Sequence, residues 1–271
     1  MAFGGAAGRA AGWLLLCWLS ALATVGRAAE WQAVQGGVVA LSHPAVVAGV
    51  RVFGRSWPVH ARAGGTVAWV GVDLARKPGD YPVRWSDGST ERLRVRQGRF
   101  STSFIEVPRS MAEFDAKKLA RIRHDQALLR AAARRPVARS FSFRFAFRPV
   151  EGVVSTPFGA RRFVNGRPRA PHSGIDIAAP RGTPVRLPAD GVVLLAAPMY
   201  LSGNTVVVGH GEGVVEIFAH LDRVAVHAGE RLHRGASVGT VGATGRATGP
   251  HLHWGVRFRG ARVTPDALLP R

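Results

Sequence analysis

Glycine and proline interrupt this sequence often, and the apolar residues between them come in runs of strand length. The chain carries 33 glycines and 17 prolines in 271 residues, and neither follows a collagen-like period. Within residues 141–271 the apolar runs are Val192–Ala196, Thr205–Val208, Val214–Phe218, Val238–Val241 and Trp254–Phe258. Short apolar runs between frequent turns are typical of sheets. We therefore predict a mainly β protein with an all-β domain over residues 141–271.

The same pattern occurs over residues 30–100. Its apolar runs are Val38–Leu41, Val50–Phe53, Val67–Val72, Tyr81–Trp85 and Glu91–Val95. Turn sequences such as Lys77-Pro78-Gly79-Asp80 separate them. This spacing predicts a small β-sandwich as an N-terminal β-rich domain. His43 and His60 stand alone there and are interpreted as packing or surface residues.

Residues 101–140 differ from both β-rich regions. From Ser110 to Arg135, apolar residues recur near helical spacing, and Pro136 closes the stretch. Across residues 109–139 nine basic residues accompany three acidic ones. Two interpretations stay open: a solvated helical connector between the domains, or a basic arm attracted to an anionic wall or membrane.

Residues 1–29 have the features of an export signal. Arg9 gives a positive start, Trp13–Val25 forms an apolar run of about 13 residues, and Gly26-Arg27-Ala28-Ala29 offers small residues for cleavage. The run is shorter than the roughly 20 residues that cross a bilayer, although an uncleaved anchor is the alternative. We expect an exported protein of the periplasm or cell envelope, with no stable membrane insertion after cleavage.

The expected location affects how the charge is interpreted. Basic residues exceed acidic ones by 37 to 17, giving a formal net charge of +20. Inside a cell such a charge would indicate nucleic acid. Outside the inner membrane the available polyanions are wall peptides, anionic glycopolymers and lipid headgroups. The arginines also lack the aromatic interleaving of a single-strand binder, so no nucleic-acid partner is expected.

Histidines gather in the C-terminal domain, which holds seven of the ten. His251-Leu252-His253 continues into an alternating apolar pattern, so it is predicted to lie on a strand with both imidazoles on one face. A His-x-His pair also occurs by chance on surfaces. His220 ends another apolar run and could be either a packed residue or a functional one.

His172-Ser173-Gly174-Ile175-Asp176 supplies two more metal-binding side chains. Gly174 and the flanking prolines disfavour a helix, and a turn leading into a strand could bring His172 and Asp176 together. With one member of the later histidine pair they would make three protein ligands. Three ligands plus water is the arrangement of a catalytic zinc ion, and such an ion activates water and polarises a carbonyl.

An ordered set of motifs resembles the M23 family of zinc metallopeptidases, the lysostaphin and LytM type that cut peptidoglycan cross-links. The motifs are Phe158-Gly159, Pro171-His172-Ser173-Gly174-Ile175-Asp176, Ala189-Asp190-Gly191, Gly203-Asn204-Thr205-Val206, Ala219-His220-Leu221, Gly242-Ala243-Thr244-Gly245-Arg246-Ala247-Thr248-Gly249 and Pro250-His251-Leu252-His253. The resemblance implies one zinc ion per chain on His172, Asp176 and His253. It assigns His251 to catalysis as the base and His220 as the transition-state stabiliser. It also implies a D,D-endopeptidase acting on peptidoglycan peptide cross-links.

The N-terminal domain supports the resemblance, and two single positions depart from the family pattern. Residues 34–41 and 67–81 resemble the β-rich module that precedes the catalytic domain in some envelope peptidases. Phe218 and Gly255 stand where many family members have Tyr and Glu. Neither change touches the expected ligand set.

Two other functions are alternatives to the enzyme. Some proteins of this fold have lost metal ligands and act by binding the wall and activating amidases, but all five site positions remain here. A lipoyl- or biotinyl-type carrier needs an acceptor lysine, and no lysine follows Lys118. The carrier is therefore excluded, and the amidase regulator stays as the alternative.

Overall fold

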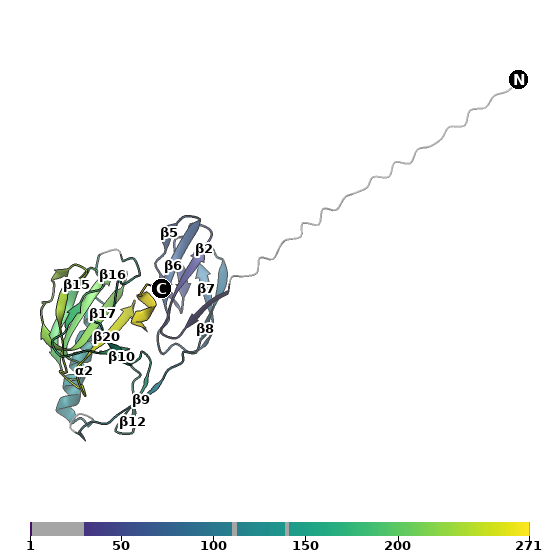
Figure 1. The fold of residues 1–271 in the computed structure, drawn as a ribbon. Coiled ribbons are helices and arrows are strands. Elements are labelled where there is room, and N and C mark those ends of the chain that lie inside the picture. Colours follow the sequence, from purple (N-terminus) through teal and green to yellow (C-terminus); the bar gives the residue numbers. More distant parts are fainter. Residues whose placement is uncertain (2–29, 110–112, 139–140, 271) are drawn as a thin grey trace.

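The computed structural model describes residues 1, 30–109, 113–138 and 141–270. Apart from Met1, the predicted export signal over residues 1–29 lies outside the described residues. No helix within the described ranges is both long and apolar enough to cross a membrane. The described chain is mainly β, as predicted, and its strands form four sheets (Figure 1).

Residues 30–96 form two sheets that share one core. The first has the order β1-β8-β7-β3-β4 and the second β2-β6-β5. Their strands are β1 (Glu30–Val34), β2 (Val38–His43), β3 (Val50–Val52), β4 (Arg55–Trp57), β5 (His60–Arg62), β6 (Gly65–Gly71), β7 (Gly79–Trp85) and β8 (Thr90–Arg96). Leu41 and Val70 of one sheet and Val83 and Leu93 of the other are fully buried. Alternating apolar side chains on facing sheets produce this core.

A ten-stranded antiparallel sheet dominates residues 153–263. Its path is β10-β13-β20-β17-β16-β15-β18, with β14, β19 and β21 paired off this path. The strands are β10 (Val153–Thr156), β13 (Gly174–Ala178), β14 (Pro184–Arg186), β15 (Gly191–Met199), β16 (Gly203–Gly211), β17 (Val214–Val224), β18 (Arg231–Leu232), β19 (Ser237–Val241), β20 (His251–Phe258) and β21 (Ala261–Val263). A short 3-10 helix, η1 (Pro265–Leu268), follows them. Leu252 and Trp254 of β20 are fully buried, so His251 and His253 lie on the opposite face of the sheet, as the alternation predicted.

A third region of sheet lies below the two larger ones in Figure 1. It consists of β9 (Thr102–Ile105), β11 (Arg161–Val164) and β12 (Arg167–Arg169) in the order β12-β11-β9. β9 runs parallel to β11, which follows it by more than fifty residues. The start of the predicted connector therefore shares a sheet with strands of the C-terminal region, which the sequence did not indicate.

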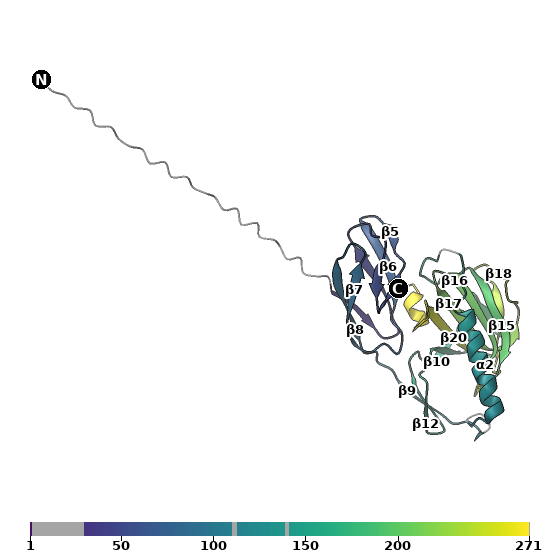
Figure 2. The ribbon, with the colours of Figure 1, turned by 180° about the vertical axis from the view of Figure 1, so that it is seen from behind.

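The predicted helix is present but starts later than expected. α2 spans Ala116–Ala132 because the Asp115 carboxylate caps it, accepting a hydrogen bond from the Lys118 backbone N at 2.8 Å. Leu129 and Ala132 pack against the sheet, and the helix crosses the outer face of the sheet in Figure 2. Asp125 is buried and accepts from the Tyr200 backbone N at 2.7 Å. One face of α2 is thus fixed to the ten-stranded sheet, so α2 is not solvated on all sides.

The N-terminal sheets and the ten-stranded sheet share apolar and charged contacts. The rings of Trp57 and Phe258 lie 5.6 Å apart between centroids. Asp73 accepts from the Arg262 guanidinium at 2.7 Å and from the Arg262 backbone N at 2.8 Å. A single apolar core cluster includes residues of both regions, such as Leu41 and Trp254. The N-terminal β-rich region and the region of the ten-stranded sheet therefore pack as one body.

Candidate active site

Two neighbouring strands and the turn before one of them position three candidate metal ligands. β13 and β20 are antiparallel, and Asp176 lies directly opposite His253 in their register. Residues directly opposite on one face have side chains within contact distance. His172 lies in the turn that leads into β13, where Gly174 is needed because a Cβ would collide with the Trp254 carbonyl oxygen. A turn followed by a strand therefore brings the side chains of His172 and Asp176 together.

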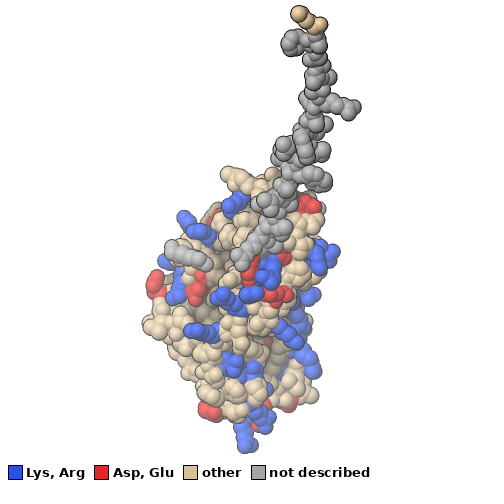
Figure 3. Space-filling model, turned by 90° about the vertical axis from the view of Figure 1, so that its right-hand side faces the viewer, with Lys and Arg blue, Asp and Glu red and all other residues tan. Residues whose placement is uncertain are grey.

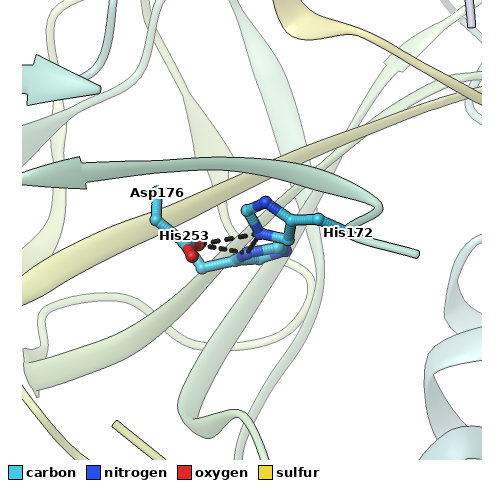
Figure 4. Close-up of side chains that lie close together, drawn as sticks. All are labelled: His172, Asp176 and His253. Carbon is cyan, nitrogen blue, oxygen red and sulfur yellow. Dashed lines mark hydrogen bonds and ion pairs between the residues drawn. The ribbon is translucent and has the colours of Figure 1, made fainter. Parts of the chain in front are cut away.

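The ligand atoms of these three residues meet at one point (Figure 4). The His172 Nε2 and the His253 Nδ1 lie 2.9 Å apart. The Asp176 Oδ1 lies 2.9 Å from the former and 2.8 Å from the latter. His172, Asp176 and His253 thus form the one cluster of potential metal ligands found among the described residues.

The donor set fits zinc. Neighbouring ligands of a tetrahedral zinc ion lie roughly 3.3 Å apart when each is about 2.0–2.1 Å from the metal, so the observed separations need to open only slightly. The His172 Nδ1 donates to the Pro157 carbonyl oxygen at 3.0 Å, which leaves the Nε2 lone pair for a ligand. Two imidazoles and a carboxylate are common zinc ligands, and outer hydrogen bonds of this kind fix the ring orientation.

The protonation states also suit a cation. Burial lowers the pKa of His172 to about 4, so the ring is neutral at pH 7. Burial alone would raise the pKa of Asp176, but hydrogen bonds with His172 and His253 outweigh it and hold that pKa far below its usual range. Arg162 adds a charged hydrogen bond, with its Nη2 2.9 Å from the Asp176 Oδ2. The cluster therefore combines a neutral imidazole with a carboxylate that stays ionised.

Two further histidines stand beside the cluster. The ring centroid of His220 lies 4.7 Å from that of His251 and 6.2 Å from that of His253. The His220 Nδ1 donates to the Thr244 carbonyl oxygen at 2.8 Å, and the His251 Nδ1 donates to the Gly249 carbonyl oxygen at 2.9 Å. In each ring the Nε2 is left as the acceptor. Burial lowers the pKa of His220 to about 3, so its neutral form prevails at pH 7.

All five predicted residues line a single cleft of about 830 Å³. The connector forms one wall, with Phe104 and Ile105 of β9, Phe114 just before α2, and Leu119 and Ile122 in the first two turns of α2. Three arginines, Arg162, Arg169 and Arg246, line the same cleft. The cleft is therefore bounded by both the catalytic sheet and the connector.

Sequence reasoning missed Arg162 and Thr244 as site residues. Arg162 stands among many arginines, so nothing in its local sequence marks it as the partner of Asp176. Thr244 lies inside a quoted motif, but its contribution is a backbone carbonyl oxygen, which does not depend on side-chain type. Only the spatial structure reveals both roles.

The remaining histidines of the domain lie elsewhere. His227 and His233 have side chains that are 83% and 94% exposed, and each begins a turn outside the strands. His210 is fully buried, with its Nε2 2.7 Å from the Glu216 Oε2. Glu216 also accepts from the Trp254 Nε1 at 2.5 Å. This buried network stabilises the interior side of β16, β17 and β20.

Comparisons with known proteins point to one family. The model of peptidase family M23 matches residues 170–265. The DD-carboxypeptidase/endopeptidase Mpg of Neisseria meningitidis is 43% identical over 115 residues, which are 42% of this chain and 26% of that protein. The peptidoglycan DD-endopeptidase ShyA of Vibrio cholerae is 41% identical over 111 residues, again 41% of this chain and 26% of that protein. The chain thus matches about a quarter of the length of these curated relatives.

A solved structure extends the similarity to most of the chain. A putative peptidase M23 from Pseudomonas aeruginosa is 36% identical, with a TM-score of 0.68. The alignment covers 87% of this chain and 94% of that one, so it includes N-terminal β-rich residues outside the family model. The M23 model, this long alignment and the convergent His-Asp-His cluster agree, and the chain belongs to peptidase family M23.

Proposed function

We propose that this protein is a zinc metalloendopeptidase that hydrolyses the peptide cross-links of peptidoglycan, with D,D-endopeptidase specificity. The observation that carries the proposal is the intact cluster of His172, Asp176 and His253, which opens into a cleft beside two more histidines. The curated relatives that match this region are named for DD-endopeptidase activity. An amidase regulator of the same fold would have no need for the complete set.

In this proposal His172, Asp176 and His253 hold one zinc ion. Bound there, zinc lowers the pKa of water towards 7 and polarises the substrate carbonyl. The protein supplies the ionised carboxylate of Asp176 and a His172 ring held in orientation by the Pro157 carbonyl oxygen. The ligands are therefore arranged before the metal arrives.

His251 is proposed as the general base. Its Nδ1 is held by the Gly249 carbonyl oxygen, so the Nε2 lone pair is directed away from that contact and can accept a proton from the attacking water. A base anchored in this way needs no reorientation during the reaction.

His220 is proposed to stabilise the transition state. With its Nδ1 committed to the Thr244 carbonyl oxygen, the Nε2 can donate a hydrogen bond only after it has taken up a proton from the solvent in the open cleft. Developing negative charge on the substrate oxygen favours that uptake and offsets the lowered pKa. His220 thus becomes a donor as the oxyanion forms.

The place of action follows from the substrate. Peptidoglycan lies in the cell envelope, and the proposed signal over residues 1–29 would direct the chain to the periplasm. The positive charge fits an anionic wall, and Figure 3 shows Lys and Arg side chains spread over the visible face of the molecule. We assign no partner beyond the cross-linked peptides.

Digestion of purified walls tests the activity. Mass spectrometry of the released muropeptides identifies the bond that is cut, and cleavage between D-alanine and the neighbouring stem is expected. Protein exhaustively stripped of metal should be inactive and regain activity with zinc. Full hydrolysis by the stripped protein would refute the zinc assignment, and binding to walls without any cleavage would support the regulator.

Metal analysis of single variants separates the ligands from the catalytic groups. His253→Ala should lose both zinc and hydrolysis because it removes a ligand. His251→Ala and His220→Ala should keep zinc near one per chain while turnover falls by about 10²–10⁴-fold. The assignment fails if His251→Ala loses zinc while His253→Ala retains it.

A further inference from the structure

Arginines gather on one side of the active-site cleft. Arg162, Arg169 and Arg246 all line it, together with only two carboxylates, Asp176 and Glu106, among the described residues. Arg162 is engaged by Asp176 at 2.9 Å. Glu106 lies on the exposed segment after β9. The cleft therefore holds more positive than negative charge close to the catalytic histidines.

Two of these arginines face each other across a hairpin. Arg162 of β11 and Arg169 of β12 are direct partners in the antiparallel register. Like charges directly opposite on neighbouring strands destabilise a hairpin. The Arg162 Nε is also buried without a hydrogen-bond acceptor. The hairpin therefore places a second guanidinium next to the one that Asp176 engages.

Arg246 is held in place by its backbone. Its N donates to the Leu201 carbonyl oxygen at 2.8 Å, and the preceding Gly245, at φ +73°, packs so closely on Gly203 that a Cβ would collide with it. Within the described part of the chain no carboxylate forms an ion pair with Arg246. Burial, and then the charges of Arg162 and Arg169, lowers the pKa of its guanidinium. A fixed, half-buried guanidinium without a counterion has the charge and the fork geometry to bind a carboxylate.

We propose that Arg246 and Arg169 bind a carboxylate of the substrate peptide next to the scissile amide, so that the enzyme selects cross-linked peptides whose flanking carboxyl group is free. This inference rests on the proposed function, because the arginines share one cleft with the catalytic residues and the anion must then be part of the peptide. A guanidinium fork matches the two oxygens of a carboxylate. Amidation of the carboxyl group removes both its charge and one acceptor oxygen.

The test compares two synthetic cross-linked peptides that differ only in this group, one with a free carboxylate and one with a carboxamide. A charge-assisted hydrogen bond contributes roughly a 10- to 100-fold preference, so the wild type should show a kcat/KM ratio in that range. Arg246→Ala and, separately, Arg169→Ala should bring the ratio close to one. Arg246→Lys should give an intermediate ratio because lysine keeps the charge but not the fork.

The controls separate specificity from structural damage. Arg148→Ala removes an exposed arginine that pairs with Asp266 and does not line the cleft, so its ratio should equal that of the wild type. A wild-type ratio near one would overturn the proposal. An Arg246→Ala protein that loses activity on both peptides equally, with the ratio intact, would overturn it as well.

A second measurement keeps this inference separate from the proposed function. If the wild type cleaves neither peptide, the proposed activity fails. Calorimetry of the zinc-free protein with the same two peptides then decides the carboxylate site. Tighter binding of the free carboxylate, weakened at least 10-fold by Arg246→Ala, supports the site, and equal binding of both peptides refutes it.

Discussion

Gly203→Ala should impair catalysis through the loop that orients His220. Gly203 has φ +61°, and a Cβ built on it would lie closer than 3.0 Å to the backbone of Thr244. The Thr244 carbonyl oxygen is the acceptor for the His220 Nδ1. The added methyl group must therefore displace the atom that fixes the ring.

The magnitude has two parts. Left-handed backbone at an alanine costs about 1–2 kcal/mol, and forcing a methyl group into a packed contact costs a further 1–3 kcal/mol or so. A catalytic group displaced by about 1 Å can cost on the order of 10²-fold in rate. We expect the free energy of unfolding to fall by roughly 2–5 kcal/mol and kcat to fall by about 10²-fold, with zinc content unchanged.

Gly88→Ala is the matched control. Gly88 also has a positive φ, of +90°, but a Cβ there would meet nothing within 4 Å, and it lies in the turn between β7 and β8. The free energy of unfolding of this variant should fall only by the backbone contribution, about 1–2 kcal/mol, and its activity should be unchanged. Urea unfolding and turnover of a cross-linked peptide measure both quantities. If Gly203→Ala loses no more stability than Gly88→Ala and keeps its turnover, the position of the Thr244 carbonyl oxygen does not control the orientation of His220.

Three other predictions concern charge and burial. In metal-free protein the folded pKa values of about 4 for His172 and about 3 for His220 lie below the unfolded value of roughly 6.5. The unfolded chain therefore binds more protons, and stability should fall by about 1 kcal/mol per histidine as the pH drops from 7 to 5.5; urea titrations showing a rise instead would contradict this. Glu216→Ala leaves His210 and Trp254 buried without their acceptor, so thermal unfolding should report a loss of about 3–5 kcal/mol, and Glu216→Gln a smaller one. Binding to purified walls should weaken as salt rises, because exposed charges are screened over about 8–10 Å at physiological ionic strength; sedimentation with walls at increasing salt would refute the electrostatic model if binding did not change.

The mainly β fold was predictable because its strands are short, alternating and separated by turns. Leu252 and Trp254 on one face, with His251 and His253 on the other, follow directly from a period of two. The parallel pairing of β9 with β11 joins segments distant in the sequence and leaves no local pattern. The sequence pattern did not predict the buried face of α2 either, because alanines supply part of the contact and basic residues surround them.

The site was predictable as a set of residue types, while its geometry was not. The motifs identified the histidines and Asp176 through their similarity to a family, and the structure then brings them within contact distance. The hydrogen bond from His220 to Thr244 depends on a backbone oxygen. It also depends on Gly203 and Gly245, where a side chain would collide with the neighbouring backbone. The facing of Arg162 and Arg169 depends on the register of one hairpin, which residue spacing alone does not determine.

The contacts between the N-terminal sheets and the catalytic sheet limit how such a chain can be recombined. A graft of residues 170–265 into another scaffold would uncover Phe258, which packs on Trp57, and leave Arg262 without Asp73. An uncovered aromatic surface of this kind promotes aggregation. Calorimetry of the intact chain should accordingly show one melting transition in place of two. An engineer who wants only the catalytic chemistry would have to carry the N-terminal sheets along or redesign the surface that they cover.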